Sequence, residues 1–255
     1  MKRDAILTPA ELPTLARRDL RQTVCVVFDV LRATSTVVTA LQHGAREVIP
    51  VSEISEALAI KKSRPDVLLA GERDGLRIRA AQTGGTDFDL GNSPREFIPQ
   101  KIRGRTIVSS TTNGTRALRA CAGAKTVLAA SFLNLRATAQ FLRTRRANEW
   151  LLVCAGTREN VALEDVLAAG ALCEISDGEL TDAAQIALAA WRQAQADLAA
   201  AVSRSENGRR LLALPELRDD VPFCLQRDAF PLVAQMKNGA LRRWTPAKSA
   251  SRRRQ

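Results

Sequence analysis

The 255-residue chain contains no tyrosine, and only 4% of its residues are aromatic. A set of aromatic side chains that stack on bases is therefore missing, which argues against an RNA-binding protein. No apolar run approaches the ~20 residues that a membrane span needs, and the N-terminus lacks the apolar core of a signal peptide. We therefore expect a cytoplasmic protein with no membrane partner.

Metal-binding and disulfide signatures are also absent. The chain has one histidine and five widely spaced cysteines, none in a CxxC pair, so neither a disulfide framework nor a zinc ribbon is predicted. His43 falls at the end of an expected helix, where a cation meets the negative end of the dipole, and a structural role is favoured. Zinc chemistry and a Ser-His triad are then not expected. The P-loop, GxGxxG and GxSxG motifs are missing as well.

Positive charge is concentrated at the C-terminal end. The net charge is +11, and residues 237–255 hold seven Lys or Arg and no acid, which leaves +4 on the rest. We expect a single α/β domain over residues 1–241 and a basic, flexible tail over 242–255. A tail that binds nucleic acid or phospholipid is the less favoured interpretation.

Apolar runs alternate with helical patterns along the chain. The predicted strands are Val24–Phe28, Glu47–Val51, Val67–Ala70, Arg105–Ser109, Thr126–Ala130 and Trp150–Cys154. The predicted helices are Thr34–His43, Ile54–Lys62, Thr115–Cys121, Phe132–Arg145, Ala162–Ile175 and Ala183–Val202. This alternation predicts a three-layer α/β/α sandwich around a largely parallel or mixed sheet, with a helical C-terminal region. A long loop is expected over residues 71–91.

Small, polar and charged residues follow five of these strands. In open α/β sheets ligands bind beyond the carboxyl ends of the strands, so the sequence predicts a site at one edge of the sheet. Asp29 follows the first strand and is interpreted as a metal ligand or nucleophile, with a helix cap as the alternative. Arg32 is suited to phosphate or carboxylate, with a surface ion pair as the alternative.

Two loops offer further candidates. Thr111–Thr115 joins a strand to a helix, where free backbone amides suit phosphate; an ordinary helix cap explains the sequence equally well. Ser93 and Glu96 match a capping box, which leaves Asn92 free to face the site.

Two acids and a cysteine complete the set. Glu164 and Asp165 open a helix, where the dipole alone favours acids, but Mg²⁺ also needs one or two carboxylates. We favour one of the pair on a metal. Cys154 ends a strand and is read either as an apolar filler, which we favour, or as a nucleophile activated by Arg158 and the following helix.

Six segments occur in an order and at spacings that resemble the 2-phosphosulfolactate phosphatase family. They are FDVLRATST (28–36), AGER (70–73), FDLGNSP (88–94), TTNGT (111–115), CAGT (154–157) and LED (163–165). The resemblance implies an α/β/α fold, Mg²⁺ dependence, and hydrolysis of 2-phospho-3-sulfolactate to 3-sulfolactate and phosphate, a step of coenzyme M biosynthesis. Related 2-hydroxy-acid phosphates are further substrates to test. Asp87 departs from the pattern, which leads us to expect glycine there.

The resemblance and the residues together give a working assignment. Mg²⁺ is placed on Asp29 and Asp165, with Glu72 or Glu164 assisting. The other expected site residues are the catalytic Arg32 and Cys154 and the substrate-binding Arg73, Asn92, Thr111, Thr112, Asn113, Gly114, Thr115, Arg116 and Arg158. The partner is a small anionic phosphate ester. The sequence does not decide whether the protein forms a homo-oligomer.

Two other function classes remain at this stage. A strand that ends in Asp together with a later strand that ends in Cys is also reminiscent of isochorismatase-like cysteine hydrolases, which are expected to keep activity in EDTA. The basic tail suggests a non-catalytic protein that binds anions or nucleic acid, and its binding is expected to be salt-sensitive.

Overall fold

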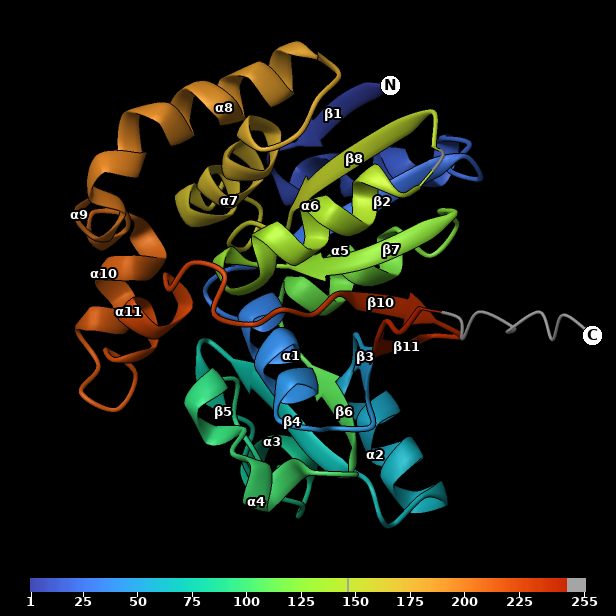
Figure 1. Cartoon of the computed structure of the whole chain (residues 1–255). Coiled ribbons are helices and arrows are strands. Elements are labelled where there is room, and N and C mark those ends of the chain that lie inside the picture. The colour runs from blue at the N-terminus through green and yellow to red at the C-terminus, as the bar shows by residue number, and fades with distance from the viewer. Residues whose placement is uncertain (146, 247–255) are drawn as a thin grey trace, which may run out of the picture.

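A mixed β-sheet forms the centre of the protein in the computed structural model, which describes residues 1–145 and 147–246 (Figure 1). Within these residues the strand order is β5-β4-β6-β3-β11-β10-β7-β2-β8-β1-β9. The strands are β1 (Lys2–Ile6), β2 (Thr23–Phe28), β3 (Glu47–Val51), β4 (Leu68–Arg73), β5 (Leu76–Arg77), β6 (Thr106–Ser110), β7 (Thr126–Ala130), β8 (Glu149–Cys154), β9 (Glu179–Leu180), β10 (Ala234–Lys237) and β11 (Ala240–Arg243).

A hairpin near the C-terminus joins two groups of parallel strands. Strands β4, β6 and β3 form one group, and β7, β2, β8, β1 and β9 form the other. Strands β10 and β11 lie between them and are antiparallel to each other, to β7 and to β3. Each of the three pairings β7–β10, β10–β11 and β11–β3 reverses the strand direction. Because three is an odd number, the two groups of parallel strands run in opposite directions. A largely parallel sheet was one of the two predicted forms, and the mixed form is the one observed.

Helices cover both faces of the larger strand group. Helices α6, α7 and α8 pack on one face, and α1 and α5 pack on the other. The α-helices are α1 (Ala33–Gln42), α2 (Ile54–Ser63), α3 (Ala80–Thr83), α4 (Pro99–Ile102), α5 (Gly114–Ala120), α6 (Leu135–Arg143), α7 (Leu163–Glu174), α8 (Asp182–Ala194), α9 (Leu198–Ser203), α10 (Glu206–Leu212) and α11 (Asp220–Cys224). Four 3₁₀ helices in the described residues are η1 (Pro9–Arg17), η2 (Pro94–Glu96), η3 (Phe132–Asn134) and η4 (Gln195–Asp197). The predicted α/β sandwich is confirmed.

The core follows the two-residue period of the strands. Along β2, Val24, Val26 and Phe28 face α7 and α8, whereas Cys25 and Val27 face α1 and α5. All five are essentially inaccessible to solvent, because side chains of a strand point alternately to the two faces and both faces are covered. No helix in the described part of the chain is long and apolar enough to cross a membrane.

Three sequence-based expectations need correction. The predicted loop over 71–91 contains the end of β4, strand β5 and helix α3. The predicted helix over 183–202 is divided into α8, η4 and α9. The domain boundary after residue 241 falls inside β11, because Arg242 pairs with Glu47 of β3 and Trp244 packs edge-on against Phe141. The rest of the expected tail, 247–255, lies outside the described residues.

Candidate active site

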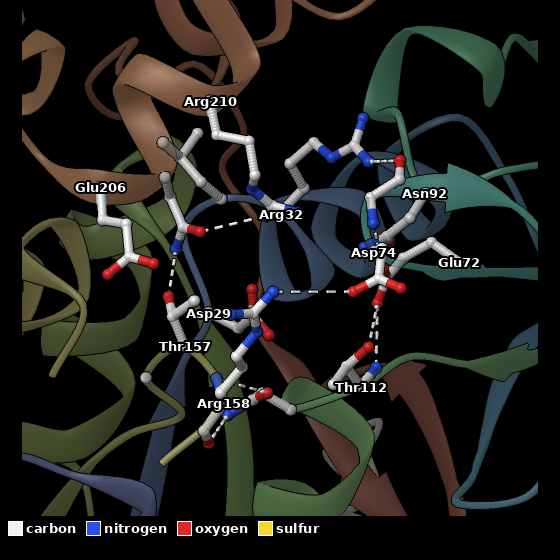
Figure 2. A pocket seen from close by; sticks show the side chains of 15 residues that line it. Asp29, Arg32, Glu72, Asp74, Asn92, Thr112, Thr157, Arg158, Glu206 and Arg210 are labelled. Atoms are coloured by element: carbon white, nitrogen blue, oxygen red, sulfur yellow. Dashed lines mark hydrogen bonds and ion pairs between the residues drawn. The ribbon is translucent and has the colours of Figure 1, made fainter. Parts of the chain in front are cut away.

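Loops after four strands and one C-terminal helix enclose a polar pocket (Figure 2). The loops follow β2, β4, β6 and β8, and the helix is α10. The residues that line it are Asp29, Leu31, Arg32, Glu72, Asp74, Gly75, Asn92, Thr112, Asn113, Gly156, Thr157, Arg158, Glu206, Asn207 and Arg210. The expected site therefore forms, although the strands that supply it run in opposite senses and do not share one edge of a parallel sheet.

Asp29 presents one carboxylate oxygen to the backbone and one to the pocket. Oδ1 accepts a hydrogen bond from the Ala33 amide at 2.9 Å, as a helix cap does. Oδ2 has no hydrogen-bond donor among the described residues. A side chain at Gly114 would place its Cβ 2.6 Å from Oδ2, so only glycine leaves this oxygen free. The cap and ligand interpretations of Asp29 therefore apply to different oxygens.

Burial raises the pKa of Asp29 to about 7. The amide of Ala33 lowers this pKa, the charges of Glu72 and Glu164 raise it, and Arg32 lowers it. Burial penalises the charged form, and nearby carboxylates add repulsion. A cation beside Oδ2 would compensate for both effects.

Glu72 lines the pocket together with Asp29 and two further carboxylates, Asp74 and Glu206. Its Oε1 accepts from the amide and hydroxyl of Thr112 at 2.9 and 3.0 Å, and its Oε2 accepts from the amide of Gly75 at 2.7 Å. Glu72 thus joins the loops after β4 and β6. Thr112, expected to bind phosphate, donates both its amide and its hydroxyl to this carboxylate instead.

Asp165 and Glu164 lie behind the pocket and do not line it. Asp165 accepts from the amides of Val30 at 2.7 Å and Gly156 at 3.0 Å, one on each oxygen, and so fixes the loops after β2 and β8. Burial and the charge of Asp29 raise its pKa well above the usual range. Glu164 is buried too, and its Oε2 has no hydrogen-bond partner in the described structure. Asp165 and Glu164 therefore hold the surrounding loops and α10 in place and do not face the pocket.

The Thr111–Thr115 segment is held by hydrogen bonds within itself and by hydrogen bonds to neighbouring loops. The Thr111 hydroxyl accepts from the Thr115 amide at 3.2 Å, and the Thr115 hydroxyl donates to the Thr111 carbonyl at 2.8 Å. Asn113 Nδ2 donates to the carbonyls of Ala155 and Arg158, both at 2.8 Å. The Thr111 hydroxyl thus caps the first turn of α5, whereas Asn113, at the N-cap position, makes no capping hydrogen bond and instead attaches the loop after β8 to α5.

The four expected arginines are not equivalent. Arg32 and Arg158 line the pocket. The Arg73 guanidinium donates four hydrogen bonds to Glu72, Ser110 and Ser52, and three of them go to backbone carbonyl oxygens. Arg116 forms an ion pair with Glu159. Arg73 and Arg116 do not line this pocket.

Cys154 belongs to the hydrophobic core and does not line the pocket. Burial raises its pKa well above the usual range, and the charge of Asp165 acts in the same direction. A thiol needs a lowered pKa and access to its target to act as a nucleophile. The geometry thus favours the apolar-filler interpretation.

Two further expectations concern polar side chains. The Asn92 amide faces the pocket and has no hydrogen-bond partner among the described side chains and backbone groups, as expected for a residue free to face a ligand. The capping box of Ser93 and Glu96 is wrong, because the Ser93 hydroxyl donates to Asp220 at 2.6 Å and Glu96 binds Gly91 and Arg77. His43 has a structural position, with Nδ1 2.7 Å from the Phe97 carbonyl.

The C-terminal helices contribute residues that the sequence reasoning missed. Glu206, Asn207 and Arg210 of α10 line the pocket, and Asp220 of α11 pairs with Arg32 at 2.7 Å behind it. The sequence signal for this contribution is a polar cluster that follows the alanine-rich helical region, Ser205-Glu206-Asn207-Gly208-Arg209-Arg210.

The described residues offer few protein ligands for a metal ion at this site. In residues 1–145 and 147–246, no group of three or more His, Cys, Asp or Glu side chains is placed to hold a metal ion. Mg²⁺ commonly takes one or two carboxylates and completes its shell with water and phosphate oxygens. The open Oδ2 of the buried Asp29, with Glu72 beside the same pocket, fits an ion bound in that way.

Comparison with known proteins points to one family. A family model described as 2-phosphosulpholactate phosphatase matches residues 7–239. A protein of Caldanaerobacter subterraneus subsp. tengcongensis is 39% identical over 88% of this chain and 92% of its own length. Proteins of Thermotoga petrophila (42% identity, 84% and 89% coverage) and Deinococcus radiodurans (40%, 85% and 88%) are similar too. All three are named probable 2-phosphosulfolactate phosphatase.

Proposed function

Since the chain belongs to the 2-phosphosulfolactate phosphatase family, we propose that it hydrolyses 2-phospho-3-sulfolactate, or a related 2-hydroxy-acid phosphate, to the hydroxy acid and phosphate. It is thus a phosphoric monoester hydrolase. The observation that carries the substrate proposal is the pocket itself, which is lined by Arg32, Arg158 and Arg210 as well as by Asp29. A substrate with phosphate, sulfonate and carboxylate groups matches three cations.

We propose Mg²⁺ as the cofactor, with Asp29 as its main protein ligand and Glu72 beside it. The bound ion would neutralise charge on the phosphoryl oxygens, which is a general contribution of metals to this chemistry. Relative to the sequence-based assignment, Glu72 replaces Asp165, because Glu72 lines the pocket and Asp165 lies behind it, fully buried between the amides of Val30 and Gly156. Asp165 then acts by fixing the loops that carry Asp29 and Gly156.

The protein's own groups mainly position the substrate and balance its charge, as phosphoryl transfer requires. The arginines and the Asn92 amide bind its anionic groups. Water is the nucleophile that we favour, because the Cys154 thiol lies outside the pocket. The oxygen of this water forms the new bond to phosphorus while the bond between phosphorus and the hydroxy-acid oxygen breaks. The hydroxy-acid oxygen leaves with a proton that the water gives up. A role in coenzyme M biosynthesis is part of the same proposal.

Phosphate release from 2-phospho-3-sulfolactate tests this function directly. We expect the purified full-length protein to release phosphate in the presence of Mg²⁺ and to lose that activity after exhaustive treatment with EDTA. Readdition of Mg²⁺ is expected to restore the rate. Activity that persists in EDTA would refute the metal proposal, and a folded protein that hydrolyses none of a panel of 2-phospho acids would refute the substrate class.

Replacing Cys154 by serine separates the phosphatase from a cysteine hydrolase. We expect Cys154→Ser to retain more than about a tenth of the wild-type rate, a change below ~1.4 kcal/mol in the barrier. The reason is that the thiol is buried in the core and does not line the pocket. The assay is kcat for phosphate release by a variant whose circular dichroism matches wild type. Complete loss, together with a trapped phosphocysteine in the wild-type enzyme, would contradict this assignment.

A further inference from the structure

Arg210 is the pocket cation that lacks a carboxylate partner. Arg32 pairs with Asp220 at 2.7 Å, and Arg158 lies 4.0 Å from Asp74. Arg210 forms no ion pair within the described residues, although it lines the same pocket. Its positive charge is therefore available to a ligand, whereas the other two charges are at least partly balanced by the protein.

A neutral side chain holds Arg210 in place. The Oδ1 of Asn207, which lies one turn earlier on α10, accepts from Arg210 Nη2 at 3.0 Å. The Nδ2 of Asn207 donates to Thr157 at 2.5 Å and to Glu164 at 2.8 Å. These two donations fix the orientation of a buried amide, so its oxygen must face Arg210. Asn207 thus orients the guanidinium without neutralising it.

Arg210 and Arg32 also lie close to each other. A Cβ built on Gly75 would be 3.0 Å from Arg210 Nη1 and 3.9 Å from Arg32 Nη2. Two cations around one point repel each other, and an anion bound between them removes that cost. Figure 2 shows Arg210 and Arg32 on one side of the pocket, and Arg158 and Thr112 on the other.

We propose that Arg210 is a specificity-determining residue that binds the second anionic group of the substrate, its sulfonate or carboxylate, while the phosphate lies beside Asp29. This inference rests on the proposed function. The role of Arg210 is to favour binding of 2-phospho acids that carry a second anionic group over binding of simple phosphate esters. Removing a guanidinium that binds a ground-state anion raises KM and leaves kcat largely unchanged.

The test compares Arg210→Gln with Arg209→Gln. Arg209 is the neighbouring exposed arginine of α10 and does not line the pocket, so the two variants change net charge equally. For 2-phospho-3-sulfolactate we expect Arg210→Gln to raise KM at least about tenfold with kcat within about threefold, and Arg209→Gln to match wild type. Arg210→Lys should recover part of the affinity. Inhibition by inorganic phosphate should be the same in all variants.

2-Phospholactate, which keeps the carboxylate and lacks the sulfonate, tells the two anions apart. An unchanged KM for this substrate in Arg210→Gln assigns Arg210 to the sulfonate, and an equal rise assigns it to the carboxylate. A wild-type KM for both substrates overturns the inference, as does a parallel loss of phosphate inhibition. If the wild-type protein hydrolyses neither, the proposed function fails, and calorimetric binding of 3-sulfolactate to wild type and Arg210→Gln decides the inference: equal affinities overturn it.

Discussion

Asp29→Asn is expected to lower the rate of phosphate release at least ~100-fold, which corresponds to about 2.7 kcal/mol in the barrier. The variant keeps the oxygen that accepts from the Ala33 amide at 2.9 Å and removes the charge beside the open Oδ2. A carboxylate that holds a catalytic cation is worth several kcal/mol, so the loss should appear in kcat with Mg²⁺ saturating. A helix cap alone would affect stability by only ~1 kcal/mol.

The same substitution should stabilise the fold in EDTA. Burial raises the pKa of Asp29 to about 7 from the ordinary 3.8. Between these values the native state holds a proton that the unfolded state has released, so wild-type stability falls as the pH rises from about 4 to 7. Each unit corresponds to about 1.4 kcal/mol, so the full penalty is roughly 4 kcal/mol at and above pH 7. An asparagine at this position does not ionise, so the variant lacks this penalty.

Chemical denaturation at pH 5 and pH 8 measures this difference. We expect Asp29→Asn to exceed wild type in unfolding free energy by more at pH 8 than at pH 5. Asp177→Asn, at an exposed aspartate outside the pocket, is the matched control and should follow wild type at both values. A near-normal kcat in Asp29→Asn, which keeps the oxygen that accepts from Ala33, would contradict the metal-ligand role of Oδ2 and leave helix capping as the role of Asp29.

The central strands could be predicted from the sequence because burial on both faces makes them continuously apolar. Strands β3 and β7 have the predicted bounds. Strands β1, β10 and β11 escaped prediction because they carry charged residues, such as Arg3, whose guanidinium donates to the carbonyls of Cys173 and Ser176. Asn238-Gly239, both with positive φ, was a readable hairpin signal.

The candidate site was predictable where it follows the apolar strands, and less so elsewhere. Asp29 and Arg158 line the pocket from loops that follow identified strands, and Glu72 lines it from the end of the identified strand β4. Whether a polar side chain faces the ligand or supports another loop depends on partners distant in sequence. Asp165 illustrates this, because its partner Val30 lies 135 residues away. The contribution of α10 depends on how the C-terminal helices fold back, which local patterns do not encode.

Asp220→Ala is expected to cause the largest loss of stability, about 3–5 kcal/mol in the free energy of unfolding. Asp220 is fully buried, binds Arg32 at 2.7 Å and accepts from Ser93 at 2.6 Å. Its removal leaves the buried guanidinium of Arg32 without its carboxylate, and an unpaired buried charge is costly. At roughly 2–4 °C per kcal/mol for a chain of this size, the melting temperature should fall by about 10 °C.

Asp219→Ala provides the matched control, because the Asp219 side chain is 62% exposed and makes surface ion pairs, with Arg95 at 3.4 Å and with Arg218 at 4.0 Å. Such pairs contribute about 0–1 kcal/mol, so this variant should unfold nearly as wild type does. The double variant Arg32→Met, Asp220→Leu removes both charges and should recover part of the stability lost in Asp220→Ala. It should not recover activity, since Arg32 lines the pocket. A double variant as unstable as Asp220→Ala would show that the cost does not come from the unpaired arginine.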